Sequence, residues 1–147
     1  MPNIEILFAD VADALGIGAT SIVEKDYYVV ELLRLLQPLK FETHDLVFAG
    51  GTSLAKANVQ LNRMSEDVDI KLVPKPQIVL TRTKAKAVRK QLSHQLRDII
   101  SQSDIFQIEG ELVVCDEYRY IELLIRYPQH FNQAPCLRPF IKLELVE

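Results

Sequence analysis

The strongest constraint on the fold is a short apolar run, residues 46–49, that ends at Gly50 and Gly51. Thr52 and Ser53 follow, and either side chain can cap the first turn of a helix. The pattern predicts a buried strand, a glycine turn and a helix over residues 52–61. Glycine lets the backbone approach a ligand closely, and a helix N-terminus attracts anions. We therefore expect this turn to hold phosphate groups.

A second feature, the stretch 67–73, alternates between charged and apolar residues. Its apolar residues are predicted to face the core of a sheet, and Asp67 and Asp69 to face the other way. Two neighbouring carboxylates repel each other unless a cation lies between them. A phosphate-binding turn followed by paired carboxylates is typical of Mg²⁺-dependent chemistry on a nucleoside triphosphate. The alternative is an ordinary solvated strand face that also carries Lys71.

Further helices and strands are predicted around these two features of the 147-residue chain. Ser21 and Glu24 are interpreted as a capping box at the start of the second helix. Apolar periodicity predicts helices over 4–15, 21–36 and 83–101, and strands over 107–115, 118–127 and 140–147. This order indicates an α+β fold in which a mixed β-sheet packs against helices. We expect one domain over residues 1–147, with residues 1–44 as an N-terminal helical part.

Composition and charge exclude several classes of protein. The net charge of −3 excludes a polycation, so any RNA contact must come from a local basic patch. The densest basic stretch runs from Arg82 to Arg97, and a solvated helix face is its more common explanation. The cysteines Cys115 and Cys136 lack metal-ligand spacing. We expect a cytoplasmic protein, because the sequence shows neither a signal peptide nor a membrane span.

Three blocks of sequence resemble, in order, the landmarks of the AbiEii/AbiGii toxin family. They are EKDYYV at residues 24–29, FAGGTSLAKA at 48–57 and RMSEDVDI at 63–70. That family belongs to the DNA polymerase beta-like nucleotidyltransferase superfamily. The superfamily motif is a hydrophobic residue, Gly, then Gly or Ser, followed after a helix by an acid–hydrophobic–acid triplet. The resemblance implies a nucleotidyltransferase-like sheet and a toxin of a type IV toxin–antitoxin or abortive-infection system.

The resemblance also implies roles for individual residues. Such enzymes transfer a nucleotide from a nucleoside triphosphate to an acceptor, in some members a tRNA end. The residues that would bind the triphosphate are Gly50, Gly51, Thr52, Ser53 and, one turn into the helix, Lys56. The catalytic and Mg²⁺-binding residues would be Asp67, Asp69 and, as the third carboxylate, Glu144. A cognate antitoxin is an implied partner. Lys56 also fits an ordinary surface lysine, and Glu144 a surface acid paired with Lys142.

The third carboxylate makes a geometric prediction. The strand carrying Glu144 should lie beside the strand carrying Asp67 and Asp69, with all three acids on one face. The chain ends in that strand, whereas family members continue into a largely helical region. We expect that region to be absent here, and nucleotide binding to be stronger than turnover. Two alternatives stay open: a domain that binds nucleotide or antitoxin without turnover, and a small-molecule nucleotidyltransferase.

Overall fold

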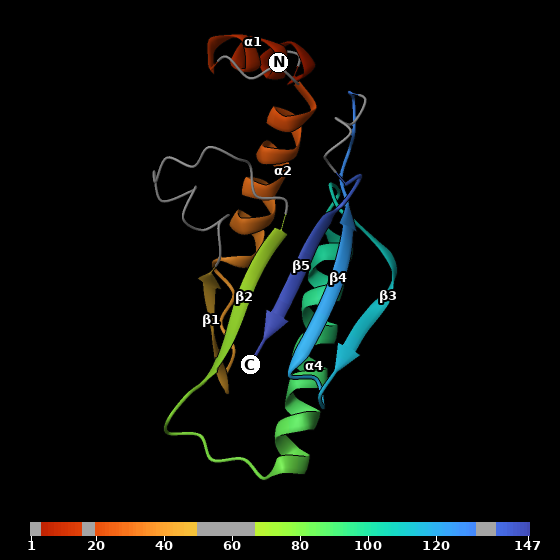
Figure 1. Cartoon of the computed structure of the whole chain (residues 1–147). Coiled ribbons are helices and arrows are strands. Elements are labelled where there is room, and N and C mark those ends of the chain that lie inside the picture. Colours follow the sequence, from red (N-terminus) through yellow and green to blue (C-terminus); the bar gives the residue numbers. More distant parts are fainter. Residues whose placement is uncertain (1–3, 16–19, 50–66, 132–137) are drawn as a thin grey trace.

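The computed structural model describes residues 4–15, 20–49, 67–131 and 138–147. The elements within these ranges, named as in Figure 1, follow in chain order. They are α1 (Ile4–Leu15), α2 (Thr20–Leu36), β1 (His44–Ala49), β2 (Asp67–Pro74), α4 (Arg82–Gln102), β3 (Gln107–Cys115), β4 (Tyr120–Arg126) and β5 (Ile141–Val146). The expected helix over residues 52–61 lies outside the described residues.

The five strands form one mixed sheet in the order β1-β2-β5-β4-β3. Strands β2 and β5 run parallel, and the other neighbouring pairs run antiparallel. Helices α2 and α4 lie on one face of the sheet, and α1 sits across the end of α2 (Figure 1). The α+β fold predicted from the sequence is confirmed. None of the helices in the described ranges is long and apolar enough to cross a membrane.

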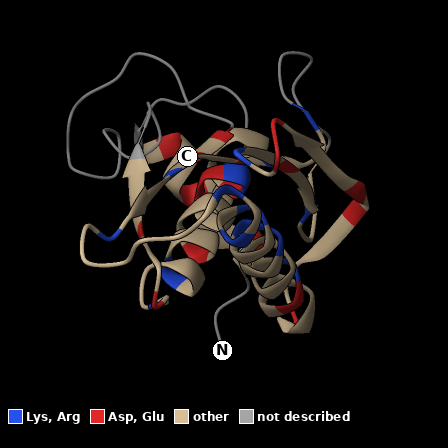
Figure 2. Cartoon of the chain, turned by 90° about the horizontal axis from the view of Figure 1, so that it is seen from below, with Lys and Arg blue, Asp and Glu red and all other residues tan. Residues whose placement is uncertain are grey.

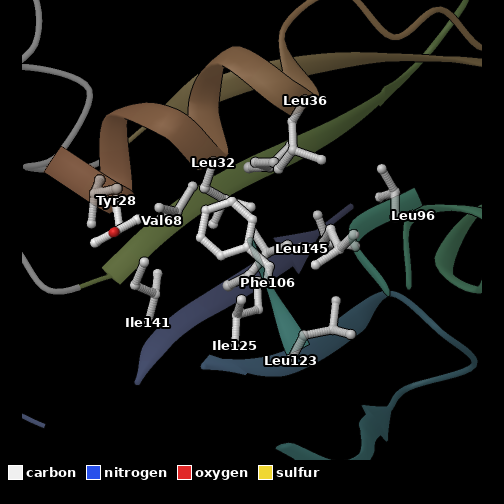
Figure 3. Packing of buried hydrophobic residues seen from close by; sticks show 14 of the residues in the cluster. Tyr28, Leu32, Leu36, Val68, Leu96, Phe106, Leu123, Ile125, Ile141 and Leu145 are labelled. Carbon is white, nitrogen blue, oxygen red and sulfur yellow. The ribbon is translucent and has the colours of Figure 1, made fainter. Parts of the chain in front are cut away.

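The core fills the space between the sheet and the two helices (Figure 3). Alternation along the strands creates it, because every second residue of β2, β4 and β5 is buried. In β2 these are Val68, Ile70 and Leu72, and in β5 they are Ile141, Leu143 and Leu145. The helices contribute residues at helical spacing, such as Leu32 and Leu36 of α2 and Leu92 and Leu96 of α4.

Local signals explain most element ends. The Thr81 side chain accepts a hydrogen bond from the Lys84 backbone N–H at 3.2 Å and caps α4. Residues 116–118 all adopt left-handed φ angles between the hairpin strands β3 and β4. Three left-handed residues cannot continue a strand, so β4 begins at Tyr120 rather than at residue 118 as expected. Gly110 also has φ +70° and lies within the register shift of β3 between Glu109 and Val113.

The capping-box interpretation of Ser21 and Glu24 is wrong. Helix α2 begins at Thr20, so Ser21 lies inside the helix rather than before it. The Glu24 side chain is fully buried and accepts hydrogen bonds from the backbone N–H of His130, at 2.9 Å, and from His130 Nδ1. A spacing of three residues predicted a local partner, whereas the actual partner lies more than a hundred residues away in sequence.

Candidate active site

The predicted carboxylates lie on the sheet face opposite α2 and α4. In the parallel pair β2–β5, Asp69 is the register partner of Glu144, and Asp67 is the partner of Lys142. Their neighbours along each strand are buried on the helix-covered face, so these side chains point to the other one. The predicted neighbourhood of the two strands, and the shared face of Glu144 with Asp67 and Asp69, are confirmed. The catalytic and metal-binding roles of these residues stay predictions.

A fourth acid extends this arrangement onto the next strand. Glu122 of β4 is the register partner of Glu144. Asp69, Glu144 and Glu122 therefore form a row across three adjacent strands, which we call the acidic row. Sequence reasoning missed Glu122. Its alternation with Ile121 and Leu123 indicated an outward-facing position, but nothing in the sequence showed that β4 and β5 are neighbours.

The first two acids of the row interact directly. The pKa of Asp69 is raised, first by burial and then by the charge of Glu144 and a side-chain hydrogen bond with it. The pKa of Glu144 is lowered, first by its hydrogen bond with Lys142. A shared proton would remove the repulsion between the two carboxyl groups. A divalent cation is the alternative partner for the same pair of oxygens, because it also removes the repulsion between them.

Lys142 connects Glu144 to Glu122. Its Nζ lies 2.7 Å from Glu144 Oε1 and 3.8 Å from Glu122 Oε2. The Tyr120 hydroxyl donates to Glu122 Oε2 at 2.9 Å, and burial together with this hydrogen bond raises the pKa of Tyr120 to about 12. Glu144 thus pairs with Lys142, as expected from the sequence, and is also the register partner of Asp69. This network fixes the Glu144 carboxylate from the side of Lys142.

Asp67 has a different cation as its partner. The Arg138 guanidinium donates from Nη2 to Asp67 Oδ1. Arg138 lies just before β5, and its backbone carbonyl accepts a hydrogen bond from the buried Lys25 Nζ at 3.0 Å. The sequence makes Arg63 the nearest cation to the acidic pair and leaves open whether it forms a salt bridge to Glu66 or Asp67 or contacts substrate. Arg63 and Glu66 lie outside the described residues. Nothing in the sequence linked Arg138 to Asp67.

The donor set fits a hard divalent cation in its chemistry. Asp67, Asp69 and Glu144 offer carboxylate oxygens, which Mg²⁺ prefers, and such ions keep some waters and take further ligands from phosphates. Within residues 4–15, 20–49, 67–131 and 138–147, no three acidic, His or Cys side chains converge closely enough to bind an ion by themselves. In the described structure Arg138 and Lys142 neutralise Asp67 and Glu144 instead.

The predicted phosphate-binding residues Gly50, Gly51, Thr52, Ser53 and Lys56 lie outside the described residues, and their role stays a prediction. The strand before them is described. Strand β1 ends at Ala49, which is the register partner of Asp69. The last residue before the Gly50–Gly51 pair is therefore directly opposite the first acid of the acidic row.

The basic stretch predicted as a possible RNA contact, Arg82 to Arg97, forms most of α4, which Figure 2 shows nearly end-on. Two of its arginines already have protein partners. Arg89 is buried and donates to the Glu117 carbonyl at 2.9 Å, and Arg82 pairs with the Glu117 carboxylate at 2.6 Å. The exposed lysines of the stretch are Lys84, Lys86 and Lys90. RNA contact through them stays a prediction.

Comparison with known proteins identifies a family. A family model described as "Nucleotidyl transferase AbiEii toxin, Type IV TA system" matches residues 33–147. The match covers most of the chain, including every strand and both blocks that contain the glycine pair and the paired aspartates. No curated protein and no solved structure was found to match the chain. The resemblance described from the sequence is confirmed.

Proposed function

Because the chain belongs to the AbiEii family of nucleotidyl transferase toxins from type IV toxin–antitoxin systems, we propose that it transfers a nucleotide to an RNA acceptor such as a tRNA, with Mg²⁺. The observation that carries this proposal is the pairing of Asp69 with Glu144 across the parallel strands β2 and β5. Burial and the charge of Glu144 raise the pKa of Asp69, so this pair of carboxyl groups favours a cation between them.

In the proposed reaction an acceptor hydroxyl attacks the α-phosphate of a nucleoside triphosphate. A new phosphorus–oxygen bond forms, the bond between the α-phosphate and the bridging oxygen breaks, and pyrophosphate leaves. The hydroxyl proton passes to the Glu144 carboxylate, which the Lys142 ammonium keeps ionised. When bound, Mg²⁺ would neutralise charge on the phosphate oxygens and favour departure of pyrophosphate. Asp67, Asp69 and Glu144 would hold it.

The remaining residues position the substrate. In phosphoryl-type transfer the protein contributes mainly orientation and charge neutralisation, rather than covalent chemistry. Gly50, Gly51, Thr52, Ser53 and Lys56 are proposed to bind the triphosphate through backbone N–H groups and side chains. The cognate antitoxin implied by the family is proposed as the partner that holds the toxin inactive.

Asp69→Asn tests the proposal most directly. The protein is incubated with each labelled nucleoside triphosphate, Mg²⁺ and total RNA, and the label is followed into RNA. We expect Asp69→Asn to lower the rate by about a hundredfold or more, because a neutral amide is a poor ligand for Mg²⁺. Glu111→Gln is the matched control, since Glu111 is an exposed acid on β3 away from the acidic row. Equal transfer by the Asp69→Asn variant and the wild type would refute the assignment.

The same experiment separates turnover from binding. If the wild type binds a nucleoside triphosphate without labelling RNA or a small acceptor, the chain is a nucleotide-binding domain rather than an enzyme. Label in an aminoglycoside or another small acceptor, but not in RNA, would favour the small-molecule nucleotidyltransferase.

A further inference from the structure

Arg138 occupies an unusual place for a cation beside a candidate metal site. Its guanidinium pairs with Asp67, one of the predicted metal ligands, and both side chains are partly exposed, at 40% and 34%. Asp67 is the first residue of β2, and Arg138 lies three residues before β5. Arg138 therefore lies at the end of the parallel strand pair at which β2 begins with Asp67.

The backbone around Arg138 is fixed from within the protein. The Lys25 side chain is fully buried, and its Nζ donates to the Arg138 carbonyl oxygen at 3.0 Å. The preceding residue of α2, Glu24, is also fully buried and holds the backbone N–H of His130 at 2.9 Å. Adjacent buried charges of α2 thus hold the chain on both sides of residues 132–137. Because the backbone is anchored and the guanidinium is partly exposed, the Arg138 side chain can turn while its Cα stays in place.

Arg138 and Lys142 differ in the exposure of their side chains. Lys142 lies between two carboxylates, at 2.7 Å from Glu144 and 3.8 Å from Glu122. The guanidinium of Arg138 is the more exposed of the two side chains. A guanidinium also binds carboxylate and phosphate with the same two-pronged geometry, so one side chain can serve both partners in turn.

We propose that Arg138 positions the nucleotide: in the nucleotide-free protein it neutralises Asp67, and it turns to the triphosphate when nucleotide and metal bind. This inference rests on the proposed function. A carboxylate oxygen that accepts from a guanidinium is a poorer metal ligand, so Arg138 competes with the ion for Asp67. An incoming triphosphate offers the guanidinium a more highly charged anion, and Asp67 is released to the metal. Binding of nucleotide and binding of metal are thereby coupled through one side chain.

The coupling predicts effects of opposite sign in an Arg138→Gln variant. Mn²⁺ alone, measured by the loss of its free electron paramagnetic resonance signal, should bind several times more tightly, because its competitor for Asp67 is gone. Each of the four ribonucleoside triphosphates with Mg²⁺, measured by titration calorimetry, should bind about tenfold or more weakly, because charge-assisted hydrogen bonds to phosphate are lost. Arg138→Lys keeps the positive charge but not the two parallel N–H donors of the guanidinium, and it should give an intermediate nucleotide affinity.

Arg126→Gln is the matched control, since Arg126 is an exposed arginine of β4 paired with Glu109 of the neighbouring strand β3. It should leave both affinities unchanged. Loss of both affinities, or no change in either, in Arg138→Gln would overturn the inference. If Arg138→Gln does not fold, the Arg138→Lys variant decides: nucleotide affinity equal to that of the wild type refutes the role. If the wild type binds no nucleotide with metal, the proposed function fails instead.

Discussion

At the scale of single residues, the sequence predicted Asp67, Asp69, Glu144 and the pairing of Glu144 with Lys142, but not the pairing of Asp67 with Arg138. Asp67 and Asp69 stood out because they alternate with apolar residues, and the strand period then fixes their face. The same rule placed Glu144 on a defined face of β5. Arg138 could not be found in this way, because its contact with Asp67 depends on how residues before β5 pass the start of β2. Only the folded chain contains that information.

Asp69 makes the stability of the protein depend on pH. Its folded-state pKa is raised above the usual 3.8, first by burial, so folding favours the protonated acid. The stabilisation is complete below pH 3.8 and is lost as the pH rises through the folded pKa, where the ionised form must be tolerated. In metal-free buffer at neutral pH we expect Asp69→Asn to raise Tm by on the order of 2 °C.

That gain should shrink as the pH falls towards 3.8, which thermal unfolding followed by circular dichroism across a pH series measures directly. Glu111→Gln, on an exposed position of β3, should show no such trend. A lower Tm for Asp69→Asn at neutral pH would contradict the conclusion that folding raises the pKa of Asp69.

At the scale of elements, periodicity predicted each described helix and strand. It did not predict the hydrogen bonds that join α2 to a segment distant in sequence. The apolar spacing of α2 predicted its buried stripe correctly. The same helix carries two charged residues at 0% exposure, Glu24 and Lys25. The sequence predicted a capping role for Glu24 and left Lys25 open between a surface residue and one bordering the nucleotide cleft. Their partners, His130 and Arg138, belong to the segment between β4 and β5. Helix spacing alone contains no signal for such partners.

Removing the Glu24 carboxylate should therefore loosen that segment. Glu24→Ala leaves the backbone N–H groups of His130 and Phe131 without their acceptor in a partly buried position. We expect the free energy of unfolding to fall by roughly 2–4 kcal/mol, measured by urea denaturation. Glu31→Ala is the control on the same helix, because Glu31 pairs with the exposed Arg34 and such pairs contribute little. Equal losses in the two variants would show that Glu24 is not an anchor.

At the scale of the whole molecule, the α+β class followed from the order of elements, whereas the strand order β1-β2-β5-β4-β3 did not. Periodicity reveals which residues are buried but not which strand lies next to which. Pairing of β5 between β2 and β4 brings Glu122 beside Glu144, and this is why the acidic row was only partly predictable. The glycine turn was recognised from sequence, but its geometry lies outside the described residues.

One buried charge joins three distant parts of this architecture. Arg89 of α4 is 1% exposed, donates to the Glu117 carbonyl in the β3–β4 turn and lies 3.4 Å from the Glu147 carboxylate. A hydrogen bond of 2.9 Å also joins Glu147 Oε2 to His44 Nε2 of β1. We expect Arg89→Ala to lower the free energy of unfolding by roughly 3–5 kcal/mol, because it removes a buried charge that donates to the Glu117 carbonyl and pairs with Glu147. Arg97→Ala, on an exposed part of the same helix, should cost less than about 1 kcal/mol in the same urea titration.

The parallel pairing of β2 with β5 also determines when, during synthesis of the chain, Asp69 and Glu144 can become neighbours. The two strands are separated in sequence by α4 and by the β3–β4 hairpin, so closing this contact costs more chain entropy than any hairpin does. On a translating ribosome, Asp69 emerges long before Glu144 can join it. A nascent chain therefore brings Asp69 and Glu144 together only after β5 has left the exit tunnel and inserted between β2 and β4.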